Sequence, residues 1–378
     1  MNLRKPLFWL HLIIGCFAAA FIFLMSLTGV ALTYERQMIK MAEISDYPSP
    51  AAQNTPLLEL DELLEKSKQY TGQNTPSYIV ENIEGAPVIM KEGRKTLAYL
   101  NPYTGEKMAT PGSGTKTFFK KLRAFHRWLT LDGKFSESGR LVNGIANLIF
   151  IALIISGIYL WLPKRMNLRS LKKGLQLART YPNKSARNYN WHHVFGFYMA
   201  PILLVVVITA VFFSFKWPGK TLKTLVSTEM IQLTELAELA LNQEALQIPI
   251  AQQLTIINKQ YPQWQTIKFG LDSSPKSTQH YQVNQGNGGE PLKRITIAID
   301  TISGAIIQEQ GFADLSTYRK MRSYIRFLHT GEIYGLWGQT IVGFASLLAC
   351  LLVYTGVLLS WQRWRNSRRV KVNKVAYS

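Results

Sequence analysis

This 378-residue chain has few cysteines and few charged residues, and both shortages limit what it can be. Its two cysteines, Cys16 and Cys350, each lie within an apolar stretch, which excludes a disulfide framework and a cysteine-based metal site. Charged residues make up 17% of the sequence, whereas soluble proteins are about a quarter charged. The sequence also lacks the GxGxxG and P-loop motifs of nucleotide-binding domains. We therefore exclude a soluble enzyme and a chain that carries its own nucleotide site.

What the sequence does have is hydrophobic residues, 47% of the total, gathered in four long blocks. Each block reaches the roughly 20 residues that cross about 30 Å of hydrocarbon. The stretch Ile13-Ile14-Gly15-Cys16 resembles a lipoprotein cleavage site, but apolar sequence continues beyond Cys16, so we expect an uncleaved span. The predicted spans are residues 8–34, 141–162, 191–215 and 336–361.

The net charge of +20 is concentrated beside these spans. Residues 1–6, 163–190 and 362–378 are rich in Lys and Arg and contain no Asp or Glu. The positive-inside rule places such stretches in the cytoplasm. We therefore expect a basic cytoplasmic loop at 163–190, a basic cytoplasmic tail at 362–378 and both termini in the cytoplasm. The charge is accounted for by a lipid bilayer, and we expect no nucleic-acid partner.

Residues 35–140 and 216–335 contain all 23 acidic residues and are predicted to lie outside the membrane. Each segment has an amphipathic helix followed by short strand-like runs and a turn, Thr104-Gly105 in the first and Ser303-Gly304 in the second. We expect two α+β domains, each a helix packed on a small antiparallel sheet. The predicted strands are 77–80, 87–90 and 96–100 in the first domain and 265–269, 280–283 and 294–299 in the second.

An internal repeat relates the two halves of the chain. His11, Gly15 and Thr28-Gly29 in the first span recur at the same spacing as His192, Gly196 and Thr209-Ala210 in the third. This predicts two copies of a span–domain–span unit in the same orientation. We interpret the glycines and hydroxyl residues as sites of close helix packing. The second and fourth spans share the pairs Ser156-Gly157 and Thr355-Gly356, and Arg123-x2-His126 and Arg326-x2-His329 precede them.

Four of the six histidines occupy repeat-equivalent places: His11 with His192 at one membrane face, and His126 with His329 at the other. The spans offer no Asp, Glu or cysteine set that would complete a zinc or di-iron site. Two imidazoles facing each other across helices fit the axial positions of a haem. We therefore predict two bis-histidine haem b groups, with ordinary interfacial histidines as the alternative.

The residues around these histidines refine the prediction. Arg123 and Arg326 lie three residues before their histidines on the same helical face, where they would pair with haem propionates or with lipid phosphates. His193 points about 100° away from His192 on a helix, so both cannot bind one iron. The repeat spacing favours His192 as the ligand, with His193 as the alternative. His280 is expected on a strand of the second external domain, as a surface or a packing residue.

These motifs resemble the PepSY-associated transmembrane family, whose members are also called iron-regulated membrane proteins. The resemblance covers nearly the whole chain, and the two external turns resemble those of PepSY modules. It implies a di-haem ferric-siderophore reductase of the bacterial inner membrane that reduces Fe(III) to Fe(II) in the periplasm. The motifs are His11-x3-Gly15, Leu27-Thr28-Gly29, Phe125-His126-Arg127-Trp128, Ser156-Gly157-x3-Trp161-Leu162-Pro163, Leu328-His329-Thr330-Gly331 and Thr355-Gly356.

On that reading, a quinol or a separate dehydrogenase donates electrons at the cytoplasmic face, and a ferric siderophore accepts them in the periplasm. Iron is then released because hard oxygen ligands hold Fe(II) more weakly than Fe(III). The candidate substrate contacts are Arg127, Trp128, Glu332 and Tyr334. Two alternatives stay open: a haem b carrier for another periplasmic acceptor, and a haem-free protein whose PepSY-like domains bind peptide or regulate a peptidase. A transporter is disfavoured because the spans lack carboxylates for ion coupling.

Overall fold

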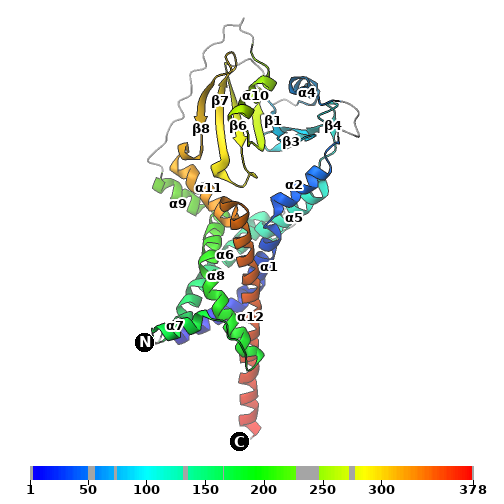
Figure 1. Ribbon diagram of the computed structural model, residues 1–378. Helices are drawn as coiled ribbons and strands as arrows, with labels where there is room; N and C mark the ends of the chain where they lie inside the picture. The colour runs from blue at the N-terminus through cyan, green and yellow to red at the C-terminus, as the bar shows by residue number, and fades with distance from the viewer. Residues whose placement is uncertain are drawn as a thin grey trace. The chain divides into compact units, whose positions relative to one another are not determined.

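The computed structural model describes residues 3–49, 56–71, 75–130, 135–164, 166–226, 247–271 and 277–376. The chain divides into two compact units (Figure 1). The helical unit comprises Met1–Tyr34, Phe119–Thr224 and Tyr324–Ser378, and the sheet unit comprises Glu35–Phe118 and Leu225–Ser323. The chain passes from one unit to the other and back, so each unit is built from both halves of the sequence.

Four long helices dominate the helical unit, and all four are long and apolar enough to cross a membrane. This confirms the four predicted spans. The first helix ends at Leu32, two residues before the predicted limit, and the last runs well past residue 361. The helices are α1 (Arg4–Leu32), α6 (Ser136–Trp161), α8 (Lys184–Ser214) and α12 (Gly335–Ala376).

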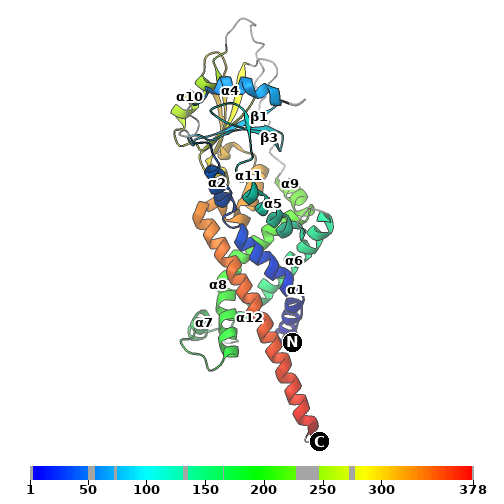
Figure 2. The same cartoon turned by 90° about the vertical axis from the view of Figure 1, so that its right-hand side faces the viewer.

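The four spanning helices, labelled in Figure 2, pack in a closed ring in which each helix contacts two neighbours. Both α1 and α8 pack against α6 and α12, so α1 and α8 occupy opposite corners of the bundle. Small residues allow this approach: Ala200, Ala345 and Ala349 lie in one buried cluster, and Ala18 lies in another. An added Cβ at Gly343 would come within 2.7 Å of the Thr33 hydroxyl. Close packing of small side chains is what holds helices together in lipid.

Shorter helices flank the spans and position residues near their ends. In the helical unit or at its border, α5 (Ser113–Trp128) precedes α6, and α11 (Thr317–Thr330) precedes α12 through the 3-10 turn η4 (Glu332–Tyr334). The basic loop contains α7 (Leu168–Leu175), and α9 (Trp217–Val226) follows α8. Asn183 caps α8, its side-chain oxygen accepting from the Ala186 N–H at 2.8 Å.

The sheet unit contains a single eight-stranded antiparallel sheet in the order β4-β3-β2-β1-β5-β6-β7-β8. Helices α4 (Leu60–Ser67) and α10 (Ile250–Gln260) pack on it through Leu63, Leu64 and Ile257, and α2 (Glu35–Ser45) opens the unit. The strands are β1 (Ser77–Glu81), β2 (Val88–Glu92), β3 (Lys95–Leu100), β4 (Lys107–Met108), β5 (Thr266–Gly270), β6 (Thr278–Asn284), β7 (Arg294–Asp300) and β8 (Ile306–Gln310).

The expectation of two separate external domains is not met, because segments 35–140 and 216–335 share this one sheet. Strands β1 and β5 pair along their whole length, from Ser77 opposite Gly270 to Glu81 opposite Thr266. Two separate half-sheets would each leave an edge of unpaired N–H and C=O groups, and pairing removes both edges. Asp61 of α4 strengthens the junction, since its carboxylate accepts from the Ile250 and Ala251 N–H groups of α10 at 2.9 Å.

A buried polar pair offers a test of this core. The Tyr281 hydroxyl, fully buried, donates to Gln253 Oε1 at 2.8 Å, and Gln253 Nε2 donates to the Ile248 carbonyl. Gln253→Leu should lower the free energy of unfolding of the sheet unit by about 1–3 kcal/mol, because the Tyr281 hydroxyl loses its partner. Adding Tyr281→Phe should restore part of that loss. Thermal melting of the single and double variants measures both effects, and equal melting of Gln253→Leu and wild type would contradict the assignment.

Candidate functional site

The first histidine pair consists of His126 on α5 and His329 on α11. We call it the outer pair, after the side of the membrane on which the sequence predicts it. The two ring centroids are 6.4 Å apart with an interplanar angle of 57°. The Phe213 ring meets His329 edge-on at 5.2 Å and closes one side of the pair. Residues far apart in the sequence are thus brought together at one end of the bundle.

The second pair consists of His11 on α1 and His192 on α8, near the other end of the spans. Their helices occupy opposite corners of the ring, and the two imidazoles lie close enough to interact electrostatically. His11 contacts α6 and His192 contacts α12, so each ring is attached to the helix beside its own.

All four imidazoles are attached in the same way, through Nδ1 to a hydroxyl on a neighbouring span. We call these residues the four hydroxyl anchors. Their spacing in the sequence predicts helix packing, and the structure gives them this further contact. Their recurrence at the same spacing as the histidines was the signal in the sequence. The pairs are His11 with Ser156 (2.8 Å), His126 with Thr28 (2.8 Å), His192 with Thr355 (3.0 Å) and His329 with Thr209 (3.2 Å).

The direction of these bonds follows from the anchors' other contacts. Each anchor hydroxyl donates its one proton to the carbonyl four residues earlier in its own helix, at 2.7–2.8 Å. The hydroxyl oxygen therefore accepts from the imidazole, and Nδ1 carries the hydrogen. Backbone carbonyls, which only accept, confirm this direction: Leu352 O lies 3.0 Å from His192 Nδ1, and Val206 O lies 2.9 Å from His329 Nδ1. Among the described residues, every hydrogen bond of the four rings uses Nδ1, which leaves the Nε2 lone pair available.

A small residue follows each anchor and gives the ring room to lie against the helix. An added Cβ would lie 3.4 Å from His11 Cε1 at Gly157, 3.2 Å from His192 Cε1 at Gly356 and 3.7 Å from His126 Cε1 at Gly29. The fourth position is Ala210, beside the anchor of His329. Each pair of a hydroxyl residue and a small residue therefore binds an imidazole and also serves as a helix-packing motif.

The outer pair is surrounded by positive charge. Burial lowers the pKa of Arg127, and so do the neighbouring charges of Arg123, Arg140 and Arg326. Arg123 and Arg326, the two arginines predicted to pair with propionates, therefore lie in one cluster with Arg127. Burial, His329 and Arg127 together lower the pKa of His126 to about 3, and burial also lowers the pKa of His329. Both imidazoles are therefore neutral near pH 7, as a metal ligand must be.

The other predicted substrate residues differ in their accessibility. Tyr334 is 71% exposed, whereas Glu332 is only 5% exposed and accepts from the Thr330 hydroxyl at 2.8 Å. The Arg127 guanidinium lies over the Trp128 ring, 5.2 Å from its centroid. Tyr334 is thus open to a ligand, while Glu332 is held inside the turn between α11 and α12.

The two remaining histidines lie apart from both pairs. His193 stacks against Tyr189 at 5.4 Å and against Trp161 at 5.9 Å, which directs it away from the contacts of His192. His280 is exposed on β6, as predicted. No cluster of three or more His, Cys, Asp or Glu able to hold a metal ion occurs in the part of the chain that the structure describes. Each pair therefore offers two protein ligands.

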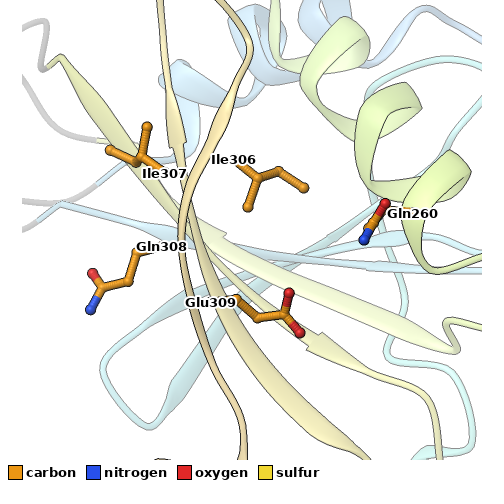
Figure 3. Close-up of a pocket in the computed structure, with 5 residues that line it drawn as sticks. All are labelled: Gln260, Ile306, Ile307, Gln308 and Glu309. Atoms are coloured by element: carbon orange, nitrogen blue, oxygen red, sulfur yellow. The ribbon is translucent and has the colours of Figure 1, made fainter.

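The sheet unit has an open pocket of about 430 Å³ beside β8 (Figure 3). It is lined by Gln260 of α10 and by Ile306, Ile307, Gln308 and Glu309. Glu309 is the one ionisable residue among the described residues that line it, and none of the six histidines is among them. This composition offers no acid–base pair, so the histidine pairs remain the candidate site.

Glycines in α6 and α12 allow these spans to pack closely against the helices that carry the outer pair. An added Cβ at Gly139 of α6 would lie 1.6 Å from the Trp128 carbonyl oxygen, and one at Gly338 of α12 would lie 2.1 Å from the Gly331 oxygen. Asn143 of α6 also donates to the His126 carbonyl at 3.0 Å. The end of α5 is therefore held in backbone contact with α6.

Gly139→Ala should displace the end of α5 and lower the thermal stability of the helical unit, because the clash involves backbone atoms. Gly114→Ala, in the first turn of α5, is the control: an added Cβ there meets nothing within 4 Å, and Ala favours the helix by about 1 kcal/mol. Melting temperatures of both variants test this, and a Gly139→Ala protein as stable as Gly114→Ala would contradict the contact.

Comparison with known proteins agrees with this architecture. No curated protein matches the chain. The family model described as the PepSY-associated TM region matches residues 8–363, which include all four spans and both histidine pairs. The chain therefore belongs to the PepSY-associated transmembrane family.

Proposed function

We propose that this protein carries two haem b groups and passes electrons across the bacterial inner membrane to a ferric siderophore in the periplasm. The observation that carries the proposal is the state of the four histidines. Each donates through Nδ1 to a fixed acceptor and keeps the Nε2 lone pair available. A neutral imidazole with one nitrogen held by a hydrogen bond is the usual form of a metal-binding histidine.

The outer pair fits a haem by its donor set and its spacing. Imidazole–metal bonds are about 2 Å long, and each ring centre lies about 1 Å behind its nitrogen, so two axial imidazoles have centroids roughly 6 Å apart. The observed separation is 6.4 Å. The arginine cluster supplies the positive charge that propionates require, with Arg123 and Arg326 as the predicted partners.

The inner pair would hold the second haem through His11 and His192. Within each half of the chain, the histidine of the span and the anchor of the outer histidine share one helix. His11 and Thr28 lie roughly 26 Å apart along α1, at about 1.5 Å of rise per residue. The two sites therefore fall at opposite ends of the bundle, which is the arrangement a transmembrane electron carrier needs.

The predicted two-fold repeat draws support from the sheet unit. Each half has one helix, α4 or α10, followed by four antiparallel strands, and the strand order is symmetric about the β1–β5 pair. A two-fold relation between the halves would bring each histidine to face its repeat partner. The basic stretches favour an orientation with both termini in the cytoplasm, and the sheet unit would then lie in the periplasm.

Haem held by two histidines would supply one-electron redox chemistry, which suits electron transfer rather than oxygen binding. The chain's own residues do the rest. His11 and His192 would hold the group at the end of the bundle where a quinol or a separate dehydrogenase would donate electrons, since the cytoplasmic segments carry no nucleotide motif. Arg127, Trp128 and Tyr334 would hold the ferric chelate near the outer pair, where Arg suits oxygen-rich anions.

Haem content tests the proposal directly. Protein purified in detergent from cells with ample haem should give about two b haems per chain in a pyridine haemochrome assay. Replacing His126 or His192 with Ala should remove about half of the haem, because each variant deletes one axial ligand. His280→Ala is the matched control and should keep the full content. Wild-type protein without haem would overturn the proposal and favour the haem-free peptide-binding alternative.

Reoxidation by a ferric siderophore separates a reductase from a general carrier. The dithionite-reduced protein, freed of excess reductant and held without oxygen, should be reoxidised by a ferric siderophore with release of Fe(II). Haem that stays reduced in its presence would favour the carrier for another acceptor.

The arginine cluster predicts a charge effect on that reaction. Arg127→Gln should slow reoxidation by an anionic ferric chelate roughly three- to tenfold at low ionic strength, because one steering charge is lost. The difference should shrink as salt is added. Arg94→Gln, in the exposed turn between β2 and β3, is the control and should leave the rate unchanged. Stopped-flow spectra at several salt concentrations measure both, and a salt-independent defect would argue against electrostatic guidance.

A further inference from the structure

We propose that the four hydroxyl anchors (Thr28, Ser156, Thr209 and Thr355) are positioning residues that set the reduction potential of each haem. The inference rests on the proposed function, since it concerns the iron that Nε2 of each histidine would bind. It assigns a role to residues that are otherwise explained by helix packing alone.

The anchors are rigid hydrogen-bond acceptors. Ser156 donates to the Ala152 carbonyl at 2.7 Å, and Thr355 donates to the Leu351 carbonyl at 2.8 Å, so neither hydroxyl is free to rotate. Thr355 is fully buried and Ser156 is 7% exposed. In such surroundings water cannot replace the hydroxyl oxygen, and the imidazole depends on the protein for its Nδ1 acceptor.

An acceptor on Nδ1–H changes the electronic character of the ligand. As the N–H is drawn towards the acceptor, Nε2 becomes a stronger donor, and a stronger donor stabilises Fe(III) relative to Fe(II). The reduction potential of the iron is therefore lower with the acceptor than without it. Hydrogen bonding around the ligands is one of the means by which proteins tune haem potential.

The four histidines are not anchored equally. His192 and His329 each have a backbone carbonyl as a second acceptor. For His11, Ser156 is the one acceptor found among the described residues. Removal of Ser156 thus leaves His11 Nδ1 without a partner, whereas removal of Thr355 leaves His192 with Leu352. The Ser156 hydroxyl should therefore have the larger effect on the inner site.

The test is a spectroelectrochemical titration of the purified holoprotein. In Ser156→Ala, one of the two midpoint potentials should move to a more positive value, while the other serves as an internal reference. A tenfold loss in the preference for Fe(III) corresponds to about 59 mV for a one-electron couple. Thr355→Val should shift the same potential by less. Ser156→Thr, which keeps the hydroxyl, should restore the wild-type value.

Ser346→Ala is the matched control. Ser346 is buried on α12 and donates to the Val342 carbonyl at 2.9 Å, as the anchors do to theirs, but it has no hydrogen bond to a histidine. Its removal should leave both potentials unchanged. Equal shifts in Ser346→Ala and Ser156→Ala would overturn the inference, because the effect would then be general loosening of the bundle.

The outcomes separate this inference from the proposed function. Wild-type protein without haem contradicts the function. Two haems with unchanged potentials in Ser156→Ala contradict the inference alone. Loss of one haem from Ser156→Ala supports the inference if Ser156→Thr restores that haem and Ser346→Ala keeps both haems. The same loss contradicts the inference if Ser346→Ala loses haem as well.

Discussion

The arrangement of this protein depends on placing four neutral imidazoles among apolar helices without leaving their N–H groups unsatisfied. The free-energy cost of burying a donor without an acceptor is about as large as the gain from several favourable packing contacts. Ser and Thr meet the need because their hydroxyls donate to their own helix and still accept from a neighbour. The small residue that follows lets the ring approach closely. The same few residues therefore satisfy the histidines, bring the helices together and leave one nitrogen of each ring available.

This constraint also explains why the spans form a ring. Each imidazole reaches the helix beside its own: His11 reaches α6, and His192 reaches α12. Helices α1 and α8 are then held at opposite corners by contacts to the pair between them. Alanine, leucine, isoleucine and valine side chains fill the bundle interior. The histidine–hydroxyl contacts therefore lie towards the two ends, and an apolar core separates them. Two distinct sites, insulated from each other by hydrocarbon side chains, follow from that order.

Much of this was readable from the sequence because its signals are periodic or charged. Hydropathy predicted the four spans, and short strand-like runs predicted the six inner strands β1–β3 and β5–β7. The edge strands β4 and β8 were missed, since the two residues of β4 are too few to form a pattern. The β1–β5 pairing could not be predicted, because it joins strands nearly 190 residues apart and no local feature specifies a partner. At the candidate site, equal spacing predicted the histidine pairs, but the anchors required the relative rotation of the helices.

The shared sheet also bears on how the chain is made. Strand β1 leaves the ribosome long before β5 exists, so its pairing edge stays open while the intervening residues are synthesised. At about 5–20 residues per second, this interval is on the order of 10–40 s. Meanwhile two further spans enter the bilayer. The first half-sheet thus waits as an exposed template that other strands can capture. The sheet is therefore completed in the order of synthesis, when β5 pairs with β1. A chain truncated before β5 would keep the unpaired edge of β1, where other strands can bind.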